Sequence, residues 1–222
     1  MDKLFLLDAY ALIYRAYYAL IKNPRINSKG FNTSAVLGFV NTLEDVLKKE
    51  KPTHIGVAFD PSGPTFRHEA YEQYKAQREE TPEVIRLSVP IIKDIIHAYR
   101  IPILEVPGYE ADDVIGTLAT QAGKQGITTY MMTPDKDYGQ LVGSNVFMYR
   151  PRYGDKDFDV LGVEEVKEKL LTLQYIREEL AKTDKNKPTT LKENNDSSNT
   201  FSHKSNILLT EYVLVHSYNE QG

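Results

Sequence analysis

Apolar runs alternate with amphipathic segments along most of the 222-residue chain. Short runs rich in apolar residues predict strands at Lys3–Leu7, His54–Phe59, Ile101–Glu105, Ile127–Met132 and Asn145–Arg150. Helical spacing of apolar residues predicts helices between them, at Ala9–Ile21, from Ser34 to Leu47, from Glu83 to Tyr99, at Glu110–Ala122 and at Val163–Leu173. Because strands that are separated by helices usually pair in parallel, the pattern favours an α/β fold with a mainly parallel sheet.

Three segments depart from this alternation. Pro90 lies inside a predicted helix, where we expect a kink or a break. Arg67–Glu80 is charged on nearly every side, which predicts an exposed or bridging helix outside the core. Lys182–Asn206 is rich in polar residues without periodicity and is typical of a linker or of disorder. An apolar patch follows it at residues 207–215 and is either a strand or a sticky tail. We therefore expect one domain over residues 1–175 and a divergent, partly disordered tail over residues 176–222.

Three of the apolar runs lead into an aspartate, at Asp8, Asp60 and Asp135. Glu110, Asp112 and Asp113 lie between the second and third of these aspartates, and Asp137 follows just after Asp135. In an open α/β sheet, ligands bind in the crevice at the carboxyl ends of parallel strands. If the runs are neighbouring strands, the acids share one cleft, and such crowded charge requires cations to neutralise it. Each acid alone is better interpreted as a helix N-cap or a solvated loop residue, but the repetition favours a divalent-metal site.

Composition narrows the choice of metal and location. The chain contains no cysteine, and its five histidines lack ligand-like spacing, so oxygen ligands and Mg²⁺ or Mn²⁺ are favoured. Asp8 and Arg15 interrupt the apolar N-terminal segment, which argues against a signal peptide, and no transmembrane span is predicted. We expect a cytoplasmic protein.

The net charge of −4 is unevenly distributed. Residues 9–43 contain no acid, while Arg15, Lys22, Arg25 and Lys29 are basic. A smaller basic group consists of Arg150, Arg152 and Lys156. A basic surface beside an acidic, metal-loaded cleft is what a nuclease requires, although an ordinary solvated surface explains the basic residues alone equally well. Two divalent cations in such a cleft can stabilise the attacking and leaving oxygens of a phosphoryl displacement.

Five sequence blocks are similar to the 5′-nuclease (flap endonuclease-like) family, and within it to the N-terminal 5′→3′ exonuclease domain of bacterial DNA polymerase I. The blocks are Leu7–Tyr17, Val57–Arg67, Tyr74–Arg78, Gly108–Gly116 and Thr133–Leu141. The resemblance covers about residues 1–170, in order and without large gaps. It implies a PIN-like three-layer α/β domain with a helical arch. It also implies a metal-dependent 5′→3′ exonuclease or flap endonuclease of replication and repair, which cuts DNA or RNA–DNA at a 5′ flap, a nick or a free 5′ end.

The resemblance also implies roles for individual residues. The first of two metal ions would be surrounded by Asp8, Asp60, Glu110, Asp112 and Asp113. Asp135 and Asp137 would reach toward the second ion. The expected substrate-binding residues are Arg15, Arg67, Tyr74, Lys75 and Arg78, with Tyr74 stacking on a terminal base and Lys75 and Arg78 holding a phosphate. Tyr10, Tyr14 and Tyr17 share one helical face, which is either a stacking surface or core packing.

The chain departs from the family pattern in two places. Ala9 stands where the family usually has a glycine. The aspartate-rich motif that completes the family's second metal site is matched only by residues 194–199, where Asp196 is a weak candidate ligand. We expect the divergent tail over residues 176–222 to replace the family's DNA-gripping C-terminal subdomain in a truncated chain, and we expect no polymerase domain. We therefore expect an incomplete second site, reduced cleavage and partial rescue by Mn²⁺; the alternative is a catalytically weak, nucleic-acid-binding remnant of the fold. A dehalogenase-like phosphotransferase is disfavoured, because Tyr10 stands where that site needs an acid. A receiver domain is disfavoured, because it needs paired acids at its first strand, whereas Asp112 and Asp113 begin a later helix.

Overall fold

A six-stranded sheet forms the centre of the computed structural model, which describes residues 2–71, 73–75, 80–152 and 158–169. The strands are β1 (Lys3–Asp8), β2 (His54–Ala58), β3 (Ile103–Leu104), β4 (Thr128–Met132), β5 (Val146–Pro151) and β6 (Phe158–Leu161). Their order in the sheet is β3-β2-β1-β4-β5-β6. Strands β1 to β5 pair in parallel, whereas β6 runs antiparallel to β5. The predicted mainly parallel sheet is confirmed.

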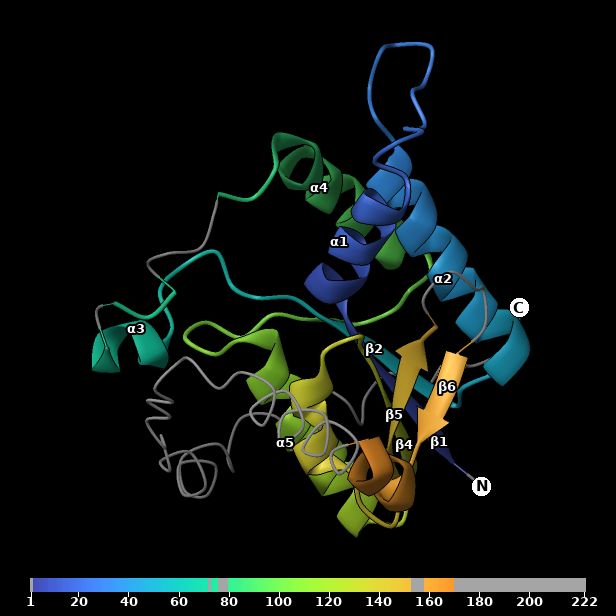
Figure 1. Cartoon of the computed structure of the whole chain (residues 1–222), viewed down its shortest axis with the longest axis vertical. Coiled ribbons are helices and arrows are strands. Elements are labelled where there is room, and N and C mark those ends of the chain that lie inside the picture. The colour runs from blue at the N-terminus through green and yellow to red at the C-terminus, as the bar shows by residue number, and fades with distance from the viewer. Residues whose placement is uncertain (1, 72, 76–79, 153–157, 170–222) are drawn as a thin grey trace, which may run out of the picture.

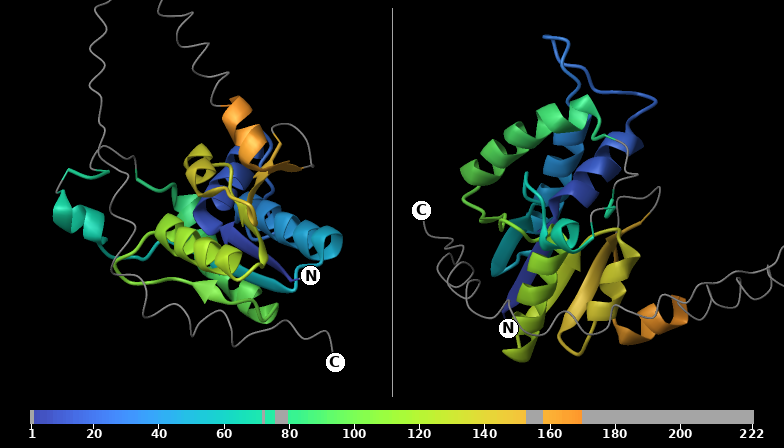
Figure 2. Two further views of the ribbon diagram at one scale, coloured as in Figure 1. Left: turned by 90° about the horizontal axis from the view of Figure 1, so that it is seen from below. Right: turned by 90° about the vertical axis from the view of Figure 1, so that its left-hand side faces the viewer.

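Helices cover both faces of this sheet and make three layers (Figures 1 and 2). One face packs against α1 (Ala9–Ala19), α2 (Ser34–Glu50) and α4 (Glu83–Ala98). The other face packs against α5 (Ala111–Lys124). None of the helices within the described ranges is long and apolar enough to cross a membrane.

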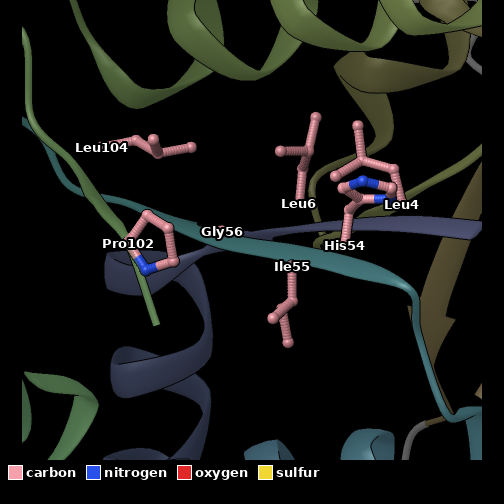
Figure 3. A pocket seen from close by; sticks show the side chains of 7 residues that line it. All are labelled: Leu4, Leu6, His54, Ile55, Gly56, Pro102 and Leu104. Carbon is pink, nitrogen blue, oxygen red and sulfur yellow. The ribbon is translucent and has the colours of Figure 1, made fainter. Parts of the chain in front are cut away.

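Side-chain alternation along the buried strands explains the three layers. In β1, Phe5 and Leu7 join the core under α1, α2 and α4, while Leu4 and Leu6 join the core under α5. Figure 3 shows the same alternation near β3, where Leu4 and Leu6 point to one side of the sheet and Ile55 to the other. The hollow there measures about 10 Å³, which is room for about one water molecule. Both faces of the central strands are therefore buried in tightly packed core.

The order of the strands creates a crevice beside β1. From β1 the chain proceeds to β2 and β3 on one side, and then returns to place β4 on the other side of β1. The chain thus reverses direction across the sheet between β1 and β4, and such a switch point opens a crevice at the carboxyl ends of the strands. Asp8 ends β1, and Asp135 follows β4 closely in the sequence. The topology therefore brings two of the candidate acids to one place.

The expected helix over Arg67–Glu80 is wrong in its described part. Only α3 (Phe66–Ala70) is helical there, and residues 73–75 form a turn. A capping box of Thr65 and His68 starts α3, but none of its residues is buried. A helix this short is marginal without an apolar face to bury, so it ends after little more than one turn. Figure 1 shows α3 standing apart from the sheet, as expected of a segment outside the core.

Smaller differences concern Pro90 and the C-terminal edge. The break expected at Pro90 is wrong, because α4 continues through it as one helix. Pro90 is exposed and lies away from the buried residues Ile85, Ser88, Ile92 and Ile96, so water can solvate the carbonyl that loses its helical hydrogen bond. The antiparallel strand β6 and the 3₁₀ helix η1 (Lys136–Leu141) were not predicted. Both are too short to show a periodic pattern. Residues 163–169 are helical as expected, while the remainder of that predicted helix and residues 176–222 lie outside the described residues.

Candidate functional site

A cleft of about 730 Å³ opens at the carboxyl ends of β1, β2 and β4. Five acidic residues contribute to its wall: Asp8, Asp60, Glu110, Asp112 and Asp135. They come from the end of β1, the segment after β2, the start of α5 and the start of η1. Lys75 also lines the cleft, from the segment after α3. Five of the seven predicted acids therefore share one cavity, although they are far apart in the sequence.

Asp8 is both a helix cap and a wall of the cleft. Its Oδ1 accepts a hydrogen bond of 3.1 Å from the Ala11 N–H and so caps α1. Its Oδ2 accepts hydrogen bonds from the Thr133 hydroxyl at 3.2 Å and the Tyr138 hydroxyl at 3.3 Å. Burial, reinforced by the charge of Asp60, raises the pKa of Asp8 to about 6, although these hydrogen bonds oppose the shift. The carboxylate thus lacks a compensating positive charge.

Asp60 is tied to the start of α5. Its Oδ1 accepts a hydrogen bond of 2.8 Å from the Ala111 N–H, one of the free donors at that helix N-terminus. Glu110 is the N-cap residue of the same helix, and Asp112 and Asp113 lie in its first turn. The positive end of the helix dipole favours acids at these positions.

Three side chains of the predicted substrate-binding set contact Glu110. The Lys75 ammonium lies 2.8 Å from Glu110 Oε1, the Tyr74 hydroxyl donates to Oε2 at 3.1 Å, and the Arg67 guanidinium lies 3.4 Å from Oε2. Burial on its own would raise the pKa of Glu110, but Lys75, Tyr74 and Arg67 outweigh it and lower the pKa. Glu110 is therefore held ionised by the segment that contains α3.

The neighbouring acids Asp112 and Asp113 occupy different environments. The Asp112 side chain is 50% exposed and faces the cleft. Burial and the adjacent Asp113 raise the pKa of Asp112. Asp113 is buried, does not line the cleft, and binds Arg67 with both oxygens at 2.6 and 2.8 Å. Burial alone would lower the pKa of Arg67, but this pairing raises it.

Asp135 and Asp137 also differ from each other. Asp135 is exposed, lines the cleft and caps η1 by accepting the Asp137 N–H at 2.9 Å. Asp137 is exposed and is not part of the cleft wall. The structure therefore brings Asp135, but not Asp137, to the other candidate acids.

The remaining predicted residues are distributed as follows. Arg15 donates a hydrogen bond of 3.0 Å to the Arg152 carbonyl and does not line the cleft. Arg78, Lys156 and Asp196 lie outside the described residues. Tyr10 and Tyr14 line the cleft and also pack against the core, whereas Tyr17 only packs against the core. Core packing is therefore confirmed for all three tyrosines, whereas a stacking role for Tyr10 and Tyr14 stays a prediction.

Two residues that bind Asp8 were missed by sequence reasoning. Thr133 is fully buried, and its hydroxyl also accepts the Asp135 N–H at 3.2 Å. Tyr138 is buried, and burial together with the charge of Asp8 raises its pKa. Its place in an unpredicted 3₁₀ helix left no periodic signal, whereas Thr133, directly after β4, could have been found from its position.

The chemistry of the cleft suits a hard divalent cation. Its candidate ligands are carboxylate oxygens, and the uncompensated charge at Asp8 is what a bound cation would neutralise. Within the described ranges, however, no three acidic or imidazole side chains are close enough to hold one ion as they stand. Lys75 binds Glu110 and Arg67 binds Asp113, so two of the predicted metal ligands are paired with cationic side chains. Side-chain adjustment at Glu110 would therefore accompany metal binding.

Comparison with known proteins identifies a matching family and related proteins. Residues 3–171 match the family described as 5′–3′ exonuclease, N-terminal resolvase-like domain. DNA polymerase I of Bacillus caldotenax is 41% identical over 168 residues, which cover 75% of this chain and 19% of that protein. A 5′–3′ exonuclease of Aquifex aeolicus is 42% identical over 151 residues, covering 68% of this chain and 52% of that protein.

A solved structure of T5 5′-exonuclease with bound divalent metal ions (zinc) shares the fold, with a TM-score of 0.58 and 19% identity. The match covers 75% of this chain and 60% of that one. The chain thus spans about a fifth of the polymerase and about half of the Aquifex exonuclease.

Proposed function

Because this chain belongs to the family of 5′–3′ exonuclease N-terminal resolvase-like domains, we propose that its acidic cleft is the active site of a divalent-metal-dependent 5′ nuclease that acts on DNA. The observation that carries the proposal is the gathering of five acids at the switch point of the sheet. Neither helix capping nor solvation requires acids from four separate segments to face one cavity.

Mg²⁺ or Mn²⁺ would be held by the oxygens that face the cleft. Asp8, Asp60 and Asp112 would contribute to a first ion together with Glu110, and Asp135 would contribute to a second. When bound, these ions would supply Lewis-acid stabilisation of the phosphodiester and an activated water. The role of Asp137 as a ligand stays a prediction, because its side chain would first have to turn toward the cleft.

The substrate would approach over the segment that contains α3. Lys75 lines the cleft, and Tyr74 lies next to it, so a terminal phosphate could exchange with Glu110 as their partner. An unpaired 5′ end at a flap, a nick or a free terminus fits this arrangement better than continuous duplex, because Lys75 and the acids line one cavity of about 730 Å³.

A second candidate function is nucleic-acid binding with little cleavage. The observation that favours it is the absence, among the described residues, of three acids close enough to hold one ion. If Lys75 and Arg67 stay paired with Glu110 and Asp113, the cleft would attract DNA weakly and would not assemble a metal centre.

The test is cleavage of a 5′-labelled DNA flap with Mg²⁺ or with EDTA. We expect Mg²⁺-dependent cleavage near the 5′ end, and a loss of at least about a hundredfold in Asp60→Asn, because a carboxylate ligand to a catalytic metal contributes several kcal/mol. Asp94→Asn is the matched control, since Asp94 is an exposed acid on α4 outside the cleft. DNA binding without any metal-dependent cleavage would favour the second function instead.

A further inference from the structure

We propose that Arg67 and Asp113 form a positioning pair, which fixes the start of α5 so that Glu110 and Asp112 face the cleft, and that Asp113 does not itself bind a metal. This inference rests on the proposed function, because it assigns Glu110 and Asp112 to a metal site. It differs from the roles expected from the sequence, in which Asp113 is a metal ligand and Arg67 binds substrate.

The pair has the geometry of a strong ion pair. The two terminal nitrogens of Arg67 lie 2.6 and 2.8 Å from the two carboxylate oxygens of Asp113, a bidentate arrangement. The side chains are 22% and 9% exposed, so water screens the interaction only weakly. Both oxygens of Asp113 are thus committed to the guanidinium.

Asp113 is also bound to the backbone that leads into α5. Its Oδ2 accepts a hydrogen bond of 3.0 Å from the Glu110 N–H, the bond by which the third residue of a helix satisfies the N–H of its N-cap residue. The next N–H, that of Ala111, donates to Asp60. Arg67 therefore fixes the Asp113 side chain, and Asp113 fixes the backbone of Glu110. The Glu110 side chain lines the cleft from this position.

Helix geometry separates Asp112 from Asp113. Successive residues of a helix are rotated by about 100° from each other, so the side chains of Asp112 and Asp113 project in different directions. Asp112 lines the cleft, while Asp113 is absent from the cleft wall and binds Arg67. For Asp113 to bind a metal, it would have to release Arg67, and a partly buried guanidinium would lose its bidentate partner.

The test compares Arg67→Lys and Asp113→Asn with the wild type, with two readouts. Arg67→Lys keeps the positive charge and loses the bidentate fork. In metal-free protein, we expect faster amide hydrogen exchange at residues 110–113 in both variants. In Mn²⁺ titrations followed by electron paramagnetic resonance, we expect Arg67→Lys to weaken binding by about tenfold, as is usual for partners that orient metal ligands. Arg152→Lys is the matched control, because Arg152 forms an exposed ion pair with Asp159.

If Arg67 contacts only substrate and Asp113 is a ligand, the results differ. Arg67→Lys would then leave both the exchange and the Mn²⁺ affinity unchanged and would raise only the KM for DNA, which would overturn the inference. Lysine is a conservative replacement for Arg67 and should preserve the fold. Thermal unfolding of each variant tests whether the fold is preserved. If the wild type bound no Mn²⁺ at all, the proposed function would fail, whereas unchanged exchange at residues 110–113 would refute the positioning pair separately.

Discussion

Asp8→Asn should abolish metal-dependent cleavage and, at the same time, stabilise the metal-free protein. We expect cleavage to fall by at least about a thousandfold, which corresponds to about 4 kcal/mol, because asparagine removes the charge at the centre of the cleft. Without metal, that charge is unfavourable, because the half-buried position of Asp8 removes part of its hydration and raises its pKa in the folded protein from 3.8 to about 6.

The effect of Asp8→Asn on the free energy of unfolding should depend on pH. Because the pKa is raised in the folded state, ionised Asp8 destabilises the fold at pH values above about 6, and this cost disappears below the unfolded-state pKa of 3.8. Asp8→Asn should therefore gain up to about 3 kcal/mol at pH 7.5 and less at pH 4.5. Urea unfolding in EDTA at both pH values measures this. A variant that is less stable than the wild type at pH 7.5 would contradict the account of Asp8 as an uncompensated charge.

Lys75→Met should change metal affinity and cleavage in opposite directions. The Lys75 ammonium lies 2.8 Å from Glu110 Oε1, so a metal ion and Lys75 compete for this carboxylate. Removing a charge-assisted hydrogen bond of about 1.5–3 kcal/mol should tighten Mn²⁺ binding by about tenfold. Cleavage of a 5′ flap should fall by about a hundredfold, because the phosphate loses its cation. Methionine keeps the unbranched apolar stem.

Lys93→Met provides the matched control for this prediction. Lys93 is similarly exposed and pairs with Glu105 beside Phe59, but it does not line the cleft. The Lys93→Met variant should leave Mn²⁺ affinity unchanged. If Lys75→Met weakened Mn²⁺ binding, or if both variants tightened it equally, competition at Glu110 would be refuted.

The sequence was sufficient to predict the five parallel strands and the location of the cleft. Apolar runs that lead into Asp8, Asp60 and Asp135 carry the signal, because burial on both faces makes a parallel strand largely apolar, so that an acid indicates a position beyond its end. The capping interpretation of these acids was also correct for Asp8 and Asp135. Capping and cleft lining coincide, because helices start where the parallel strands end.

The partners of the acids could not be predicted. The pairing of Arg67 with Asp113 depends on where a poorly patterned segment lies in space, and no periodicity specifies that position. The same reason explains the wrong expectation of a long helix after Arg67, since charged residues are compatible with helix or turn. The domain boundary, the nature of residues 176–222 and the reduced activity stay predictions, because the described residues end at position 169.

Mn²⁺ binding to the metal-free protein tests the central claim most directly. Electron paramagnetic resonance counts free Mn²⁺ while the wild type and Asp8→Asn are titrated side by side at pH 7.5. If the acids of the cleft form a metal centre, the wild type will bind Mn²⁺ saturably and Asp8→Asn will lose its tightest site. Equal binding by the two proteins, or none by the wild type, would contradict a metal centre at the carboxyl ends of β1, β2 and β4.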